Sequence, residues 1–268
     1  MTRLAVIGTG KLGEALLSGL LRAGRAPADL MVTARRPDRA AELTERYGVR
    51  AVSNVEAAAE SNIMLLTVKP QDIESLLAEL APVATHDKLI ISVVAGIPTA
   101  LFERRLGEHT PVVRVMTNTP VLVDQAMSAI SAGANATEEH LVATEAIFEP
   151  VGKVLRVPES QQDAVTALSG SGPAYFFFLV EAMIDAGILL GLPRTVAADL
   201  MVQTVLGSAV MLRDTGEHPV RLREAVTSPG GTTINAIREL ENHGVRAAFL
   251  AAIEAARDRA RDLGHALD

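Results

Sequence analysis

Two glycine-rich stretches of this sequence have the residue types and the spacing of anion-binding sites. The first, Gly8-Thr9-Gly10-Lys11-Leu12-Gly13, follows a short apolar run and opens a helical pattern. Its glycines permit a tight turn and a close backbone approach to a pyrophosphate, which would lie on the helix N-terminus. A purely structural glycine turn is the alternative, but the strand–turn–helix context favours dinucleotide binding.

The second stretch, Ser228-Pro229-Gly230-Gly231-Thr232-Thr233, comes directly before the helical run Ile234–Glu241. Free backbone N–H groups, a helix dipole and the lack of bulky side chains make such a loop a cradle for a carboxylate or phosphate. An ordinary threonine N-cap beside a glycine turn explains the stretch by itself equally well.

The end of the second expected strand bears on the choice of cofactor. NAD enzymes place an Asp or Glu there, roughly 20 residues after the glycines, to bind the ribose hydroxyls. This chain has Ala34-Arg35-Arg36 instead, and Asp29 precedes the strand, at the wrong end of the sheet. Two guanidinium groups suit a 2′-phosphate, so the sequence favours NADPH, with NADH possible at lower preference. Two solvated surface arginines are the alternative.

Further loops follow later strands at the edge where ligands bind in open α/β sheets. They are Val68-Lys69-Pro70, Ala95-Gly96 and Met116-Thr117-Asn118-Thr119-Pro120. Their small and turn-forming residues leave room for a nicotinamide ring, although each could be an ordinary loop.

No other catalytic apparatus stands out in the sequence. The chain has no Cys, which excludes thiolate catalysis and cysteine-bound metals. Its six His residues are scattered without ligand spacing, so no metal site is predicted, and Ser171 lacks the frame of a nucleophile elbow. Hydride transfer needs none of these groups, because the nicotinamide carries the difficult chemistry.

Short apolar runs alternate with helical patterns over residues 1–157, which predicts an α/β domain with a parallel sheet. The expected strands are Leu4–Ile7, Leu30–Thr33, Ile63–Val68, Leu89–Val94 and Val112–Met116. Two further apolar runs, Ala126–Ser131 and Lys153–Val157, could complete the sheet. The expected helices include Lys11–Ala23, Pro37–Tyr47, Gln71–Leu80 and Glu138–Phe148. After Pro158 only helical patterns remain, so residues 158–268 form the second expected domain.

Composition limits the partners of the chain. Its 268 residues carry a net charge of −7, which argues against nucleic acid or an anionic membrane as the main partner. The apolar run from Tyr175 to Leu190 is interrupted by Glu181 and Asp185 and is expected to be too short to span a bilayer. No signal peptide is recognised, so the expected location is the cytoplasm.

The expected helix from Pro173 to Leu190 contains Tyr175-Phe176-Phe177-Phe178 and is apolar nearly all round. Such a helix must be buried on every side. In so small a helical domain that burial could be provided by another subunit, or the helix could be the central core helix of a monomer.

Together these residues resemble the pyrroline-5-carboxylate reductase family along essentially the whole chain. The most specific segment is Ser228–Thr233, which leads into Ile234-Asn235-Ala236-Ile237. The resemblance also rests on Gly8–Gly13, Val68-Lys69-Pro70, Asn118-Thr119-Pro120, Ala164–Tyr175 and Gly216-Glu217-His218-Pro219. One departure is Thr117, where many members have Pro, and it concerns the loop beside the nicotinamide.

The resemblance implies an N-terminal Rossmann-type doubly wound domain and an all-helical dimerisation domain. It implies a homodimer, commonly assembled into a ring of five dimers, with each active site formed between two subunits. The implied reaction reduces 1-pyrroline-5-carboxylate to L-proline with NADPH.

The resemblance also implies roles for individual residues. The implied cofactor contacts are Ile7, Gly8, Thr9, Gly10, Lys11, Leu12, Arg35, Arg36, Asn54, Thr67, Val68, Lys69, Pro70 and Ala95. The implied substrate contacts are Glu159, Thr166, Val226, Ser228, Gly230, Gly231, Thr232 and Thr233. Thr233 matches the threonine that contacts the imine nitrogen and is the expected catalytic residue, either as a proton donor or only as an orienting group.

Two other functions fit part of the sequence. The β-hydroxyacid dehydrogenases share the two-domain plan, but they use a helical lysine of the second domain as acid and base, and this chain has no Lys after Lys153. A non-catalytic NADP-sensing module would explain Gly8–Gly13 but not Ser228–Thr233.

Overall fold

The structure, a computed structural model, describes residues 2–265. Its internal contacts divide the chain into two compact units. One unit runs to Ser171 and includes the stretch from Ala256, and the other is Gly172–Ala255. The sheet ends at Arg156, and the functional division into domains 1–157 and 158–268 stays a prediction.

Within the described residues, the strands of the first unit form one eight-stranded sheet in the order β3-β2-β1-β4-β5-β6-β7-β8. The strand order reverses beside β1, which is the topological switch point of doubly wound folds. The bounds are β1 (Leu4–Ile7), β2 (Leu30–Val32), β3 (Arg50–Ala51), β4 (Ile63–Leu66), β5 (Leu89–Ser92), β6 (Val112–Met116), β7 (Ala126–Ala132) and β8 (Gly152–Arg156).

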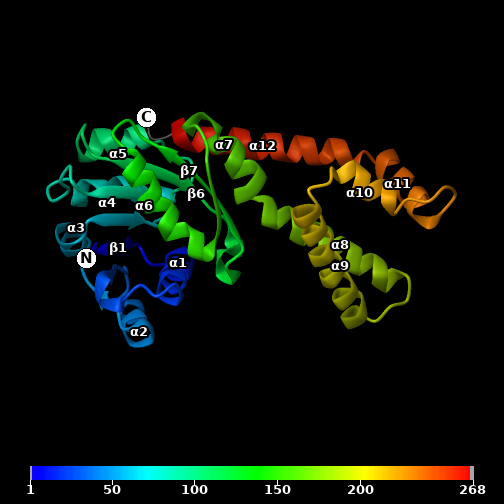
Figure 1. Cartoon of the computed structure of the whole chain (residues 1–268), viewed down its shortest axis with the longest axis horizontal. Coiled ribbons are helices and arrows are strands. Elements are labelled where there is room, and N and C mark those ends of the chain that lie inside the picture. Colours follow the sequence, from blue (N-terminus) through cyan, green and yellow to red (C-terminus); the bar gives the residue numbers. More distant parts are fainter. Residues whose placement is uncertain (1, 266–268) are drawn as a thin grey trace. The chain divides into compact units, whose positions relative to one another are not determined.

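Helices cover both faces of this sheet (Figure 1). The bounds are α1 (Lys11–Arg22), α2 (Pro37–Tyr47), α3 (Asn54–Glu60), α4 (Ile73–Leu80), α5 (Thr99–Leu106), α6 (Glu138–Phe148) and α7 (Gln162–Val165). Short helical turns lie at Pro27–Asp29, Pro70–Asp72, Thr119–Val123, Glu149–Val151, Glu159–Gln161 and Thr166–Gly170.

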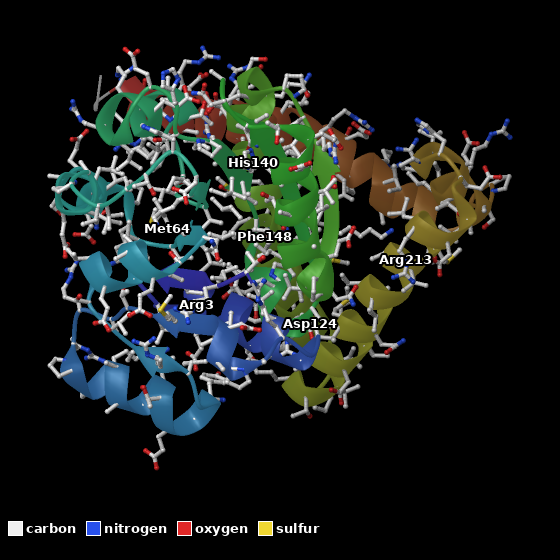
Figure 2. The ribbon with its side chains drawn as sticks, turned by 60° about the vertical axis from the view of Figure 1, so that its left-hand side comes forward. Arg3, Met64, Asp124, His140, Phe148 and Arg213 are labelled. Carbon is white, nitrogen blue, oxygen red and sulfur yellow. The ribbon has the colours of Figure 1, made fainter. Side chains whose placement is uncertain are left out.

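The alternation of side chains along the strands explains the two covered faces. Leu4 and Val6 of β1 point into one core, with α1, α2 and α6, whereas Ala5 and Ile7 point into the other, with α3, α4 and α5. Figure 2 labels one fully buried side chain of each core, Phe148 and Met64. Strands buried on both faces read as continuous apolar runs, which is why their pattern predicted them so well.

The expectation of a parallel sheet is correct for most of the strands but wrong for β7, which pairs antiparallel with β6. Only the turn Thr119–Val123 lies between these two strands. A parallel connection needs about a dozen residues or more to cross the sheet, and this linker is too short. The sequence analysis also missed β3, α3 and α5.

The second unit contains helices only. They are α8 (Gly172–Leu189), α9 (Arg194–Thr215), α10 (Pro219–Ala225), α11 (Thr232–Asn242) and part of α12 (Val245–His265). Helices α8 and α9 pack side by side (Figure 1). Their outer faces are apolar and exposed: Phe176, Phe177 and Phe178 are 58%, 68% and 74% exposed. The reading of α8 as the core helix of a monomer is therefore wrong.

Two helical stretches, Glu159–Leu189 and Arg194–Thr215, are long and apolar enough to cross a membrane by length and composition alone. The expectation that the Phe-rich segment is too short is corrected here, because the helical stretch begins at Glu159 rather than at Pro173. Faces of this kind require a cover, which is either another protein chain or lipid.

An ion-pair cluster joins α1 to α2 beside the glycine turn. Glu14 in the first turn of α1 accepts hydrogen bonds from Arg39, from Arg46 Nη1 at 3.0 Å and from the Tyr47 hydroxyl at 2.9 Å. Its side chain is only 19% exposed. Burial alone would raise the pKa of the Glu14 carboxyl, but the hydrogen bonds from Arg39 and Tyr47 outweigh it and hold the pKa below its ordinary value.

Glu14→Gln should therefore lower the free energy of unfolding at pH 7 by about 1–3 kcal/mol, since it weakens charge-assisted hydrogen bonds. The native pKa lies below the unfolded one, so the contribution is complete above about pH 4.5 and is lost as the pH falls through the native pKa. Urea unfolding at pH 7 and pH 3, at one protein concentration, measures both effects. The exposed Glu45→Gln on α2 is the control, and an equal loss at both pH values would contradict the electrostatic explanation.

Candidate active site

The turn after β1 has an open face above the N-terminus of α1. Gly8 has φ +82°, and a Cβ there would collide with the Val68 side chain. The Gly8 N–H donates to Thr33 Oγ1 at 3.0 Å, and the Thr9 N–H donates to the Thr33 carbonyl at 2.8 Å. A Cβ on Gly10, the N-cap of α1, would have its nearest neighbour 3.9 Å away. The hydrogen bonds to Thr33 thus fix the turn, and the space beside Gly10 at the N-terminus of α1 is unobstructed.

The third glycine serves packing between helix and strand. A Cβ at Gly13 would lie 2.6 Å from Thr67 Oγ1 and 3.2 Å from a methyl group of Val6. Thr67 Oγ1 in turn lies within donating distance of the Ile7 and Gly8 carbonyls, at 3.1 and 3.0 Å. Thr67 therefore connects the end of β4 to the glycine turn.

A cavity of about 800 Å³ opens at this edge of the sheet. The predicted cofactor residues that line it are Gly8, Thr9, Gly10, Lys11, Leu12, Arg35, Arg36, Thr67, Val68 and Lys69. Of the other predicted cofactor residues, Ile7 is fully buried in β1, Asn54 donates to Glu79, Pro70 opens the turn after Lys69, and Ala95 follows β5. None of these four lines the cavity.

The sequence analysis missed six lining residues: Glu14, Ala34, Arg39, Glu42, Gln71 and Asp72. Two of them carried a recognisable signal. Arg39 lies one helical turn beyond Arg35 and Arg36, and Asp72 lies three residues beyond Lys69.

Each arginine of the cavity already faces a carboxylate. Arg35 pairs with Asp72 at 2.8 Å and Arg36 with Asp38 at 3.6 Å, and both arginine side chains are at least 72% exposed. Arg39 is only 18% exposed and lies between Glu14 and Glu42. The first two arginines can exchange their partners for an incoming anion, whereas Arg39 is part of the framework.

These residues fit a nicotinamide dinucleotide. The unobstructed N-terminus of α1 suits a pyrophosphate, and a Cβ at Gly8 would require Val68 to move. The end of β2 carries cations and no acid, which suits a 2′-phosphate.

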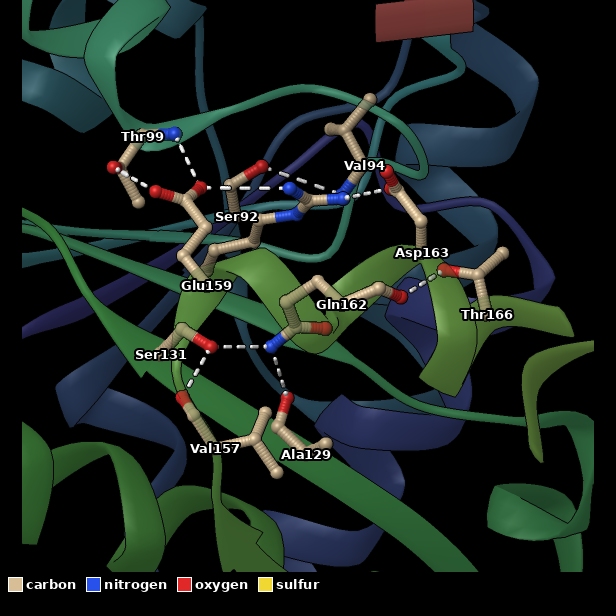
Figure 3. Close-up of polar contacts among 11 residues, drawn as sticks. Ser92, Val94, Thr99, Ala129, Ser131, Val157, Glu159, Gln162, Asp163 and Thr166 are labelled. Atoms are coloured by element: carbon tan, nitrogen blue, oxygen red, sulfur yellow. Dashed lines mark hydrogen bonds and ion pairs between the residues drawn. The ribbon is translucent and has the colours of Figure 1, made fainter. Parts of the chain in front are cut away.

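A buried polar network holds the segment that follows β8 (Figure 3). Glu159 accepts from the Thr99 N–H at 2.8 Å, from Thr99 Oγ1 at 2.7 Å and from Arg114 at 3.4 Å. The Arg114 side chain is 5% exposed and also donates to Asp163 at 3.4 Å. Glu159 thus binds the N-terminus of α5 and neutralises a buried guanidinium of β6.

Gln162 and Thr166 continue this network. Gln162 Nε2 donates to the Ala129 carbonyl at 3.1 Å and to Ser131 Oγ at 2.8 Å, and Thr166 Oγ1 donates to the Gln162 carbonyl at 2.8 Å. Glu159 and Thr166 therefore anchor their own segment within the first unit. Their role as substrate contacts stays a prediction.

The loop after β6 accommodates Thr117. This side chain is 8% exposed, and its hydroxyl accepts from Ser128 Oγ at 2.9 Å. Asn118 beside it receives the Met127 N–H at 3.0 Å and donates to the Ser169 carbonyl at 3.2 Å. Thr117, at the position where many family members have Pro, is thus hydrogen-bonded to Ser128 of β7, and the loop is well anchored.

The second glycine stretch leads into α11 within the second unit. Gly230 has φ +70°, and the Gly231 N–H donates to the Ser228 carbonyl at 3.1 Å. Gly231 is the N-cap of α11, so Thr232 and Thr233 form its first turn, with Thr233 half-buried. Ser228 and Gly230 are exposed, as is Val226 at the end of α10. The structure places the predicted residues of this stretch at one helix N-terminus.

Fold and cavity together define an oxidoreductase of the Rossmann type that uses a nicotinamide dinucleotide. Residues 3–96 match a family profile described as NADP oxidoreductase, coenzyme F420-dependent, and residues 159–263 match one described as pyrroline-5-carboxylate reductase dimerisation. A pyrroline-5-carboxylate reductase of Mycobacterium tuberculosis is 47% identical, over 98% of this chain and 97% of its own length.

Two solved structures agree with this. The pyrroline-5-carboxylate reductase of Coxiella burnetii has a TM-score of 0.91 at 37% identity, and that of Plasmodium falciparum with NADP bound has 0.90 at 29%. Each comparison covers 98% of both chains. The chain belongs to the pyrroline-5-carboxylate reductase family.

Membership explains the exposed apolar helices. The dimerisation profile spans both stretches that are long enough to cross a membrane, so both belong to a dimerisation domain and the chain forms oligomers. The interpretation of the Phe-rich helix as a subunit interface agrees with this profile and stays a prediction.

Phe177→Glu should abolish assembly, because it puts a charge in the middle of an apolar contact at a residue that is 68% exposed in the single chain. We expect monomeric or insoluble, inactive protein by sedimentation. Val142→Glu on α6, also an exposed apolar residue, should assemble normally. A fully active monomer would show that assembly is not needed for the active site.

Proposed function

We propose that the reaction of this chain, reduction of 1-pyrroline-5-carboxylate to L-proline with NADPH, uses two groups of residues. The cavity beside Gly8–Gly13 binds the cofactor, and the stretch Ser228–Thr233 binds the substrate. The observation that carries this proposal is the glycine turn at the N-terminus of α11, since an uncapped helix start is a site for a small carboxylate.

The substrate carboxylate lies at the first turn of α11. The Gly231 N–H is already engaged by the Ser228 carbonyl, so the amides of Thr232 and Thr233 are the donors that face an anion. The helix dipole adds to their attraction. Glu159, Thr166 and Val226 line the remainder of the substrate site in this proposal.

The Thr233 hydroxyl contacts the imine nitrogen. Its half-buried position in the first helical turn restricts its orientation, so it can accept a hydrogen bond from the N–H of an iminium or donate one to the nitrogen of an imine. NADPH supplies the hydride when it is bound. Reduction raises the basicity of the nitrogen, and a nearby hydroxyl then stabilises the proton that the product retains.

The cofactor contacts are proposed as Gly8 to Leu12, Thr67 to Pro70 and the two exposed arginines, with Ile7, Asn54 and Ala95 behind or beside them.

We further propose that the active site is shared between two subunits and that residues 158–268 form the substrate and dimerisation domain. We also propose that five dimers form a ring and that the enzyme is cytoplasmic.

Thr233→Val keeps the shape of the side chain and removes its hydroxyl. If the hydroxyl contacts the nitrogen more strongly in the transition state than in the ground state, kcat and kcat/KM should both fall. One hydrogen bond near a charged nitrogen corresponds to about 1.5–3 kcal/mol, or roughly 10- to 150-fold. NADPH oxidation with 1-pyrroline-5-carboxylate measures the loss, and binding of NADPH should be unchanged.

The exposed neighbour Thr232→Val is the matched control and should keep most of the activity, because its amide remains. A β-hydroxyacid should give no turnover with either variant or with the wild type. Wild-type kcat/KM in Thr233→Val would remove this hydroxyl from the mechanism.

Replacing both Arg35 and Arg36 with Ala should raise the KM for NADPH and leave the KM for NADH nearly unchanged. The lost phosphate contact corresponds to about 1.5–3 kcal/mol, so the preference for NADPH over NADH should drop roughly 10-fold or more. Initial rates with both cofactors measure it. If the double variant discriminates as the wild type does, the 2′-phosphate is bound by other residues.

A further inference from the structure

One carboxylate of the cofactor cavity has no role in the function proposed above. Asp72 lies in the short turn after Val68-Lys69-Pro70, and its Oδ2 is 2.8 Å from Arg35 Nη2. Both residues line the cavity. The arginine comes from the loop after β2 and the aspartate from the loop after β4, so the pair spans the loop edge above β1.

The position of Asp72 relates this carboxylate to the choice between NADPH and NADH. Enzymes that prefer NADH carry a carboxylate at the end of the second strand, where it accepts hydrogen bonds from the adenosine ribose. That position holds Arg35 and Arg36 here, but the carboxylate of Asp72 is salt-bridged to Arg35 itself. The cavity therefore contains both the cation for a 2′-phosphate and an acid of the kind that a 2′-hydroxyl uses.

Because this ion pair is exposed, an incoming anion can replace Asp72 as the partner of Arg35. Arg35 is 80% exposed and Asp72 31%, and an ion pair so open to water contributes little to stability. A dianionic phosphate competes well for such an arginine. Arg39 differs, because it is 18% exposed and lies between two carboxylates. Arg35, like the exposed Arg36, is thus a guanidinium whose partner a cofactor can replace.

We propose that Asp72 sets the cofactor selectivity of this enzyme by competing with the 2′-phosphate for Arg35. It occupies Arg35 in the free enzyme, repels the phosphate and, when the phosphate is missing, accepts a hydrogen bond from the ribose. Asp72 thereby weakens NADPH binding and supports NADH binding. This inference rests on the proposed assignment of Arg35 to the 2′-phosphate.

Asp72→Asn removes the charge and keeps the size of the side chain. We expect NADP⁺ to bind about 3- to 10-fold more tightly, in line with the loss of one repulsive charge and one competing surface pair. NAD⁺ should bind more weakly, because a neutral amide is a poorer acceptor for the ribose hydroxyl than a carboxylate. Titration calorimetry with NADP⁺ and NAD⁺, which differ only by the 2′-phosphate, measures this without turnover, and the melting temperature confirms that the variant folds.

Asp38→Asn is the matched control. It removes the same charge from the partner of the neighbouring Arg36, but Asp38 does not line the cavity and lies 3.6 Å from Arg36, beyond hydrogen-bond distance, so it hardly occupies that arginine. It should change the NADP⁺/NAD⁺ affinity ratio much less than Asp72→Asn. An equal change in both variants would mean that only net charge acts, and it would overturn the proposal.

A double-mutant cycle separates this proposal from the one on which it rests. If Asp72 acts through Arg35, then Asp72→Asn should have a clearly smaller effect on NADP⁺ binding in the Arg35→Ala background, where only the direct repulsion between Asp72 and the phosphate remains. If Arg35→Ala weakens NADP⁺ binding but Asp72→Asn has no effect in the wild type, the role of Asp72 is rejected and the assignment of Arg35 is retained. An Arg35→Ala variant that binds NADP⁺ as the wild type does would reject the assignment of Arg35 itself.

Discussion

The contact between Gly8 and Val68 is the constraint on which the cofactor side of the site depends. Gly8 has φ +82°, and there is no room for a Cβ between it and Val68. Thr67 connects the same two segments through the Ile7 and Gly8 carbonyls. Because β1 and β4 are neighbours where the strand order reverses, this contact places the glycine turn and the Lys69 loop at one edge. The cavity follows from that proximity rather than from any single charged residue.

The sequence predicted the features that are written in local patterns. Strands such as β1 and β6 are buried along their whole length, so they appear in the sequence as apolar runs. The glycines of the turn after β1 could be predicted because each meets a separate requirement of turn, cofactor approach or packing. The antiparallel pairing of β7 with β6 was missed, because it is determined by the length of the linker between them rather than by a residue pattern. Short α3, with its Ala-rich sequence, carries too little apolar periodicity to be recognised.

Side chains whose role depends on distant partners could not be predicted either. Glu159 was expected at the substrate, and nothing in its sequence context indicates that it binds the N-terminus of α5 and the buried Arg114. A buried guanidinium is tolerated only where carboxylates neutralise it, so β6 and the segment after β8 depend on each other. Such a dependence makes Glu159 a rigid support for the helix that begins at Gln162, whatever it contacts besides.

The arginines of the cavity show how burial separates framework from ligand contacts. All of them pair with carboxylates, although the Arg36–Asp38 pair is longer, at 3.6 Å, than the Arg35–Asp72 pair, at 2.8 Å. A partly buried pair such as Arg39 with Glu14 is destabilised if either member is removed, because the other stays partly desolvated without a counter-charge. An exposed pair loses little, because water replaces the partner. Only exposed pairs can therefore respond to a cofactor, so selectivity for the 2′-phosphate depends on which carboxylate competes at the surface of the cavity rather than on how many arginines line it.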